Sequence, residues 1–202
     1  MLRRIRIILA TLFFLSVTAL FIDSTGMAKE WLGWTAKIQF LPALLALNVV
    51  TVLALVVLTL LVGRAYCSVI CPLGVMQDVI SRISGLRKKK KSRFSYSGEK
   101  KWLRYGILVI FVVALVAGLT PLAALLAPYS SYGRMVSSVV SPSLSPVAIV
   151  AAVSFVVVAI MSWLGGRTYC NTICPVGTIL GFFSRFALFR PIIDTSKCNS
   201  CK

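Results

Sequence analysis

The chain has 202 residues, of which 58% are hydrophobic, and its mean hydropathy of +0.92 predicts a membrane protein rather than a soluble domain. It contains no histidine, which excludes His-ligated haem, Rieske-type ligation, His-containing zinc sites and His-based activation of a nucleophile. Its five acidic residues lie outside the apolar runs, which excludes intramembrane proton relays and paired-carboxylate catalysis. Any chemistry must therefore use sulfur.

The formal net charge of +17 does not by itself indicate nucleic-acid binding. A nucleic-acid interface needs a solvated basic face with aromatic or base-reading groups beside it. The Lys and Arg residues gather instead at the ends of apolar runs, as they do in the cytoplasmic loops of membrane proteins. We therefore expect membrane lipids, and no nucleic acid, among the partners.

The first apolar run, residues 5–22, carries no charge after Arg6 and has the length of roughly 17–25 residues that crosses a bilayer. No small-x-small cleavage site follows it, so we expect a retained anchor rather than a cleaved signal peptide. Residues 23–41 contain Trp31 and Trp34. This composition predicts an interfacial loop or a short surface helix outside the membrane.

The second predicted span, residues 42–62, leads into a densely basic segment, residues 64–104. Such a segment remains in the cytoplasm, which fixes the orientation of the span. Within it, residues 73–83 place apolar side chains at near-helical spacing and are expected to form a helix along the membrane surface. The basic run 87–91 is expected to be a solvated loop that can touch lipid headgroups.

The third predicted span, residues 102–127, contains Gly118, Thr120 and Pro121, so a kink or break is expected near Pro121. Residues 128–146 are rich in Ser and Pro and are expected to form an external loop. The fourth span, residues 147–164, then returns the chain to the basic side.

These runs predict an all-α membrane protein with four transmembrane helices and with both termini in the cytoplasm. The helices would form two parallel two-helix repeats, residues 1–101 and 102–190, each followed by a Cys-x-x-x-Cys-Pro motif on the cytoplasmic face. Residues 191–202 would begin an incomplete ferredoxin-type cysteine segment.

The motif Gly-Arg-x-Tyr-Cys-x-x-x-Cys-Pro-x-Gly occurs twice, at residues 63–74 and 166–177, each time where an apolar run ends. Cysteines four residues apart share one face of a helix, so each pair can point the same way. The proline either ends the transmembrane helix or opens a new one, and a cysteine at a helix start is biased toward the thiolate. Arg64 and Arg167 add positive charge nearby. Tyr66 and Tyr169 are expected either to order the site or to anchor the chain at the interface.

A typical iron–sulfur centre needs four thiolates, which neither pair supplies alone. Two pairs from parallel repeats could meet, so our preferred interpretation is one shared site. The alternative is that small buried cysteines merely pack between helices. The shared site would consist of Cys67, Cys71, Cys170 and Cys174.

The chain ends in Lys197-Cys198-Asn199-Ser200-Cys201-Lys202, half of a bacterial ferredoxin ligand run. Two thiolates are too few for a cubane cluster, so Cys198 and Cys201 are candidate metal ligands that we expect to bind no stable cluster in this chain. Residues near a terminus are usually mobile, and both cysteines are expected to be accessible to solvent.

The doubled motif, followed by a ferredoxin-type cysteine run, resembles the polytopic membrane ferredoxin proteins of the NapH and NosR class. The resemblance covers nearly the whole chain. It implies an inner-membrane electron-transfer component with cytoplasmic cysteine motifs, followed by a domain with two [4Fe-4S] clusters. Carried over by position, the four motif cysteines match the paired membrane motif, whereas Cys198 and Cys201 match the first two ferredoxin ligands. The remaining ferredoxin cysteines are absent from the sequence.

The leading functional hypothesis is an iron–sulfur protein that carries electrons between a membrane or cytoplasmic donor and a partner reductase. It would be an electron-transfer component rather than a stand-alone enzyme, with redox proteins and a membrane quinone as candidate partners. A second hypothesis is a membrane thiol–disulfide protein in which each Cys-x-x-x-Cys pair cycles as a dithiol. A third is a non-redox membrane anchor that holds structural zinc.

Overall fold

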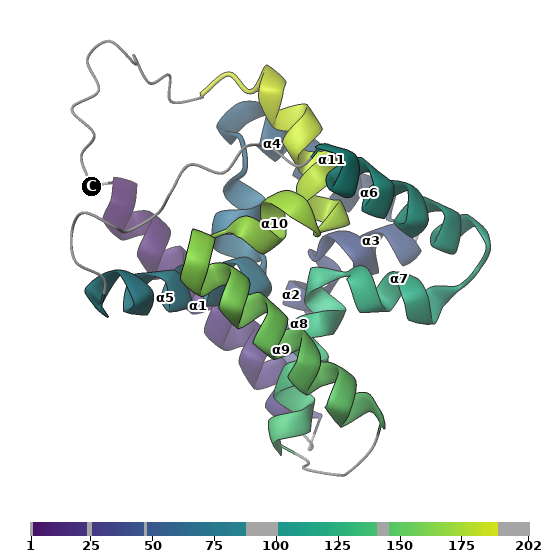
Figure 1. The fold of residues 1–202 in the computed structure, drawn as a ribbon. Helices are drawn as coiled ribbons and strands as arrows, with labels where there is room; N and C mark the ends of the chain where they lie inside the picture. The colour runs from purple at the N-terminus through teal and green to yellow at the C-terminus, as the bar shows by residue number, and fades with distance from the viewer. Residues whose placement is uncertain (1, 24–25, 47, 88–100, 141–145, 190–202) are drawn as a thin grey trace.

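The computed structural model describes residues 2–23, 26–46, 48–87, 101–140 and 146–189, and every element in these ranges is helical. Cys198, Cys201 and the basic run 88–91 lie outside the described residues. The elements, shown in Figure 1, are α1 (Leu2–Ile22), α2 (Met27–Lys37), α3 (Phe40–Leu45), α4 (Val49–Val62), the π-helical turn η1 (Tyr66–Ile70), α5 (Pro72–Arg87), α6 (Lys101–Val116), α7 (Thr120–Leu126), α8 (Pro128–Val140), α9 (Pro146–Gly165), α10 (Thr168–Thr172), α11 (Pro175–Phe183) and the 3₁₀ turn η3 (Ser184–Phe186).

Two of the four predicted spans coincide with helices long and apolar enough to cross a membrane, Arg4–Ile22 within α1 and Pro146–Gly165, which is α9. The second predicted span is divided, because the Asn48 side chain accepts a hydrogen bond from the Thr51 N–H at 3.2 Å and caps α4. The third is divided at Gly118, whose φ is 71°. The four-span arrangement therefore remains a prediction.

Large apolar side chains point away from the protein along the four longest apolar helices. Examples are Ile8 on α1 (62% exposed), Val50 on α4 (78%), Val109 on α6 (60%) and Ile149 on α9 (63%). Single exposed apolar residues are normal in soluble proteins, but rows of them on several helices mark an interaction with lipid or protein.

The main hydrophobic core surrounds the doubled motif. It contains Cys67, Cys71 and Cys174 together with residues of α1, α4, α8 and α9. Helix α5 packs against α8 and α9, and Ser84 ties it to α9 by donating a hydrogen bond to the Trp163 carbonyl oxygen at 2.9 Å. Helix α11 packs against both α4 and α6, and in Figure 1 it lies between them. The fold thus brings the second copy of the motif against the first.

Candidate functional site

The two copies of the motif begin with the same backbone conformation. Gly63 and Gly166 have φ of 73° and 72°, in the left-handed region that favours glycine. Each glycine also ends the preceding helix, since the N–H of Gly63 donates to the Thr59 carbonyl at 2.9 Å and that of Gly166 donates to the Ser162 carbonyl at 3.0 Å. Glycine is therefore required at both positions to turn the chain out of a long apolar helix.

A widened turn separates the two cysteines of each copy. The N–H of Cys71 donates to the Tyr66 carbonyl, and that of Cys174 donates to the Tyr169 carbonyl, both at 3.0 Å across five residues. The second cysteine then has extended backbone, with ψ of 115° at Cys71 and 117° at Cys174, because the proline that follows disfavours the helical region.

The cysteines of one pair consequently do not lie on one face of a single α-helix, which corrects the interpretation of their four-residue spacing. The other expectation is confirmed, because Pro72 and Pro175 open new helices at their first positions. Cys174 caps its helix, with its Sγ accepting a hydrogen bond from the Gly177 N–H at 3.4 Å. A sulfur at a helix start is in a position that favours negative charge.

The last glycine of each copy allows a close approach to the first cysteine. A Cβ atom built on Gly74 would overlap the carbonyl oxygen of Cys67, and one built on Gly177 would overlap the carbonyl oxygen of Cys170. Glycine thus allows each new helix to pack directly on its widened turn.

All four motif cysteines are free and buried, with exposed fractions of 6% for Cys67, 2% for Cys71, 5% for Cys170 and 2% for Cys174. The charge of each of the other three thiolates would raise the pKa of Cys174, which indicates that the four cysteines lie near one another. Within the described ranges, no three Cys, His, Asp or Glu side chains are placed to hold a metal ion.

Burial raises the pKa of all four thiols, and that of Cys170 to about 12. Arg64 and Arg167 act in the opposite direction on the pKa of Cys67, but burial is the larger effect. The arginines and the N–H groups at the helix starts thus act to lower the pKa of these thiols, as predicted, but burial outweighs them in the metal-free chain. These cysteines are protonated at neutral pH.

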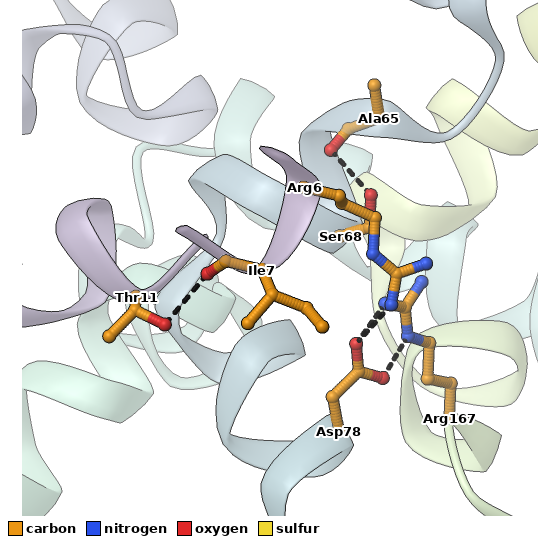
Figure 2. A network of polar contacts seen from close by, with 7 residues as sticks. All are labelled: Arg6, Ile7, Thr11, Ala65, Ser68, Asp78 and Arg167. Atoms are coloured by element: carbon orange, nitrogen blue, oxygen red, sulfur yellow. Dashed lines mark hydrogen bonds and ion pairs between the residues drawn. The ribbon is translucent and has the colours of Figure 1, made fainter. Parts of the chain in front are cut away.

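The arginine of each copy reaches across to the other half of the site. Arg167 donates from Nε to Oδ1 of Asp78 on α5 at 2.6 Å, and its Nη2 bonds Oδ2 of the same carboxylate. Figure 2 shows that Arg6 of α1 approaches this carboxylate too, with 3.4 Å between its Nη2 and Oδ2. Arg64 donates to Oδ1 of Asn171 at 2.5 Å. The two copies are thus joined by polar contacts around the cysteines.

Tyr66 is buried and ordered by a polar network that the sequence did not predict. Its hydroxyl donates to Oε1 of Gln39 at 2.9 Å and accepts from the Phe40 N–H at 3.0 Å. Gln39 also donates from Nε2 to the Ile70 carbonyl at 3.1 Å, inside the widened turn. Tyr66 (1% exposed) therefore orders the site, and Tyr169 (7%) is buried as well, so neither is an exposed interfacial anchor.

A second glutamine, also missed from the sequence, contacts a motif sulfur. Gln77 on α5 donates from Nε2 to Sγ of Cys170 at 3.1 Å. Its side chain has no exposed surface. Helix α5 also carries Asp78, Ser81 and Arg82, so nothing in the sequence signals that this one polar residue would be buried.

Comparison with known proteins finds two matches to the family described as "4Fe-4S binding domain", at residues 44–93 and 147–195. Each matched segment contains one copy of the motif. Among curated relatives, the uncharacterized protein MJ0749 of Methanocaldococcus jannaschii is 24% identical over 98% of this chain and 70% of its own length. No solved structure matches significantly.

Two further relatives have descriptive names. The methylamine utilization ferredoxin-type protein MauN of Paracoccus denitrificans is 26% identical over 69% of this chain. The putative electron transport protein YccM of Escherichia coli is 23% identical over 80% of it. The chain spans less than half of each, 46% of MauN and 45% of YccM.

The chemistry of the site fits this cofactor. It offers four buried, reduced thiols, with N–H donors from Gln77 and Gly177 directed at sulfur. Each thiolate of a [4Fe-4S] cluster binds a different iron, so its ligands lie farther apart than those of a single ion. The two family matches support an iron–sulfur cluster of the 4Fe-4S type as the cofactor of this chain.

Proposed function

We propose that this chain is an inner-membrane iron–sulfur protein that passes electrons between a membrane or cytoplasmic donor and a partner reductase. Its cluster would be bound by Cys67, Cys71, Cys170 and Cys174, two from each copy of the motif. The observation that carries the proposal is the burial of these four free thiols together in the core. The printed names of MauN and YccM support the electron-transfer role.

The burial and protonation of the thiols argue against the thiol–disulfide hypothesis. A cycling dithiol needs an accessible sulfur and a thiolate of lowered pKa. Here burial raises the pKa of each thiol, and none of the four is more than 6% exposed. Iron binding, by contrast, deprotonates a coordinating thiol outright, so a raised pKa does not oppose cluster ligation once iron is present.

The cluster would supply one-electron chemistry, and the residues around it would hold it dry and balance its charge. Arg64 and Arg167 lie close enough to Cys67 to act on its pKa, so both cations are placed to offset the charge of the thiolates. Asp78 fixes the orientation of Arg167 through two hydrogen bonds. The closed core keeps water from the sulfurs.

The exposed apolar sides of α1, α4, α6 and α9 support the proposed membrane location, with lipids covering them. The proposed topology keeps both termini and both motifs in the cytoplasm, on the basic side. The proposed units are residues 1–101 and 102–190, followed by the start of a ferredoxin-type cysteine segment, residues 191–202.

A cavity supports a quinone as one partner. About 690 Å³ of space, lined mainly by apolar side chains, lies between α1, α8 and α9. The hydroxyl oxygens of Thr18 and Tyr132 lie 2.7 Å apart at its wall. Met76, which precedes Gln77, also lines the cavity, so a bound quinone would lie near the cysteine site.

Anaerobic purification tests the proposed cofactor. We expect iron and acid-labile sulfide in equal amounts, with visible absorption that bleaches on reduction. Metal-free protein with reversible disulfides would instead support thiol cycling, and zinc without sulfide would support a structural metal. Reporter fusions after Arg93 test the topology, because strong periplasmic reporter activity there would contradict a cytoplasmic motif face.

A further inference from the structure

The helices that follow the two copies carry different side chains at one equivalent position. Gln77 lies five residues after Pro72, and Leu180 lies five residues after Pro175. Both side chains are fully buried; Leu180 belongs to the main core that contains the cysteines, and Gln77 contacts Cys170. The same place in the two halves is therefore filled once by an amide and once by an apolar chain.

The amide joins the two halves through a sulfur. Gln77 donates a hydrogen bond from Nε2 to Sγ of Cys170 at 3.1 Å. The donor belongs to the helix after the first copy, and the acceptor belongs to the second copy. The Leu180 side chain has no N–H group and cannot donate a corresponding hydrogen bond.

Packing alone does not explain the glutamine. Its Oε1 atom is buried and has no hydrogen-bond partner among the described residues, which is unfavourable for folding. Leucine occupies the equivalent position in the other half without leaving any polar atom unsatisfied. The buried amide therefore carries a cost to stability, and the side-chain hydrogen bond that it makes among the described residues is to a motif cysteine.

We propose that Gln77 is a positioning residue that sets the reduction potential of the cluster from the Cys170 side. This inference rests on the proposed function, because it requires the four-cysteine cluster. Reduction adds one electron from the redox partner, breaks no bond and increases the negative charge on the cysteine sulfurs. An N–H group directed at one sulfur stabilises that charge, so it raises the potential.

The test uses the anaerobically purified 202-residue chain and replaces Gln77 by a residue with an apolar side chain of similar length, Gln77→Met. We expect iron and sulfide as in the wild type. We also expect reduction to be about tenfold less favourable, a shift of about 59 mV to lower potential for one electron. Resonance Raman bands of the iron–cysteine bonds should shift as well, which a purely structural role would not cause.

Leu180→Met is the matched control, because it places the same side chain at the equivalent position without removing a donor. It should leave the potential and the Raman bands unchanged. Gln77→Leu, which copies the natural residue of the other half, should behave like Gln77→Met.

The possible failures are distinguishable. Wild-type protein without iron and sulfide would overturn the proposed function and this inference together. A full cluster with an unshifted potential in both Gln77 variants would overturn this inference alone. Loss of the cluster from both Gln77 variants but not from Leu180→Met would also overturn it, and would make Gln77 a residue needed for assembly.

Discussion

The two copies of the motif share the glycine that begins the turn and the proline that ends it, but they differ in the helix that follows each one. Both begin at a glycine with positive φ, and in both the second cysteine precedes a proline that opens a helix. Both also place a glycine against the carbonyl of the first cysteine. The repeated residues are thus those that shape the turn and present the sulfurs, which indicates that the two pairs have equivalent roles.

The two halves differ in the charged side chains that surround the motif. The first helix carries Asp78, which binds Arg167 and Arg6. The equivalent residue of the second helix is Gly181, and a Cβ atom there would meet the guanidinium groups of Arg64 and Arg104. The helix after the first copy therefore meets the arginine of the second copy with a carboxylate, whereas the helix after the second copy packs two arginines against a glycine. The two halves therefore differ in the residues around the cysteines and not in the spacing of the cysteines themselves.

The equivalence of the cysteine pairs predicts the largest effect. Cys71→Ser and Cys174→Ser should each lose the bound iron to a similar extent, because four thiolates are needed and each pair provides two. Iron and sulfide analysis of anaerobic preparations measures this. Full retention in Cys174→Ser, with complete loss in Cys71→Ser, would show that the halves are not equivalent.

The reactivity of the thiols gives a second test on the metal-free, reduced chain. The pKa of Cys170 is raised from 9.0 to about 12, so its thiolate fraction at pH 8 should be about a thousandfold below that of an ordinary thiol. Alkylation of the four buried cysteines should thus be slow at pH 8 and should accelerate as pH rises toward 12. Cys198 and Cys201, by the prediction for the end of the chain, should react quickly. Mass spectrometry measures the alkylation of each cysteine with time. Equal protection of all six cysteines would contradict this prediction.

The glycines at the ends of the two copies should be equally intolerant of a side chain. Gly74→Ala and Gly177→Ala place a Cβ atom on a cysteine carbonyl oxygen, and overpacking of this kind costs about 1–3 kcal/mol. Thermal unfolding in detergent measures the loss. Gly106→Ala is the control, since nothing lies within 4 Å of a Cβ atom there; because alanine is preferred to glycine inside a helix, it should be neutral or stabilise the protein by up to about 1 kcal/mol.

We expect the smallest effect on stability from substitution of Asp78, the carboxylate of the first half. Asp78→Asn removes the charge that holds Arg167, in a pair whose side chains are 23% and 28% exposed, so we expect a loss of about 1 kcal/mol. Asn171→Ala, which removes the acceptor of Arg64 in the other half, should cost less because no charge pair is broken. Equal losses of stability in Asp78→Asn and Asn171→Ala would show that the charge pair does not distinguish the two halves.

The sequence alone determined the features that depend on neighbouring residues. Proline fixes its own φ and restricts the residue before it, so the starts of α5 and α11 at Pro72 and Pro175 were predictable. Long uninterrupted apolar runs predicted the helices now seen as α1 and α9. The doubled cysteine pattern predicted an iron–sulfur cofactor, which the family matches support.

Only the tertiary structure decided how the two halves meet. Asn48 and Gly118 divide the other two predicted spans, a choice between capping and continuation that apolar content does not reveal. The bonds from Gln77 to Cys170 and from Arg167 to Asp78 each join residues far apart in the chain. No local periodicity encodes such pairs. Burial, which raises the pKa of the thiols against the effect of the arginines, exists only once the helices have packed.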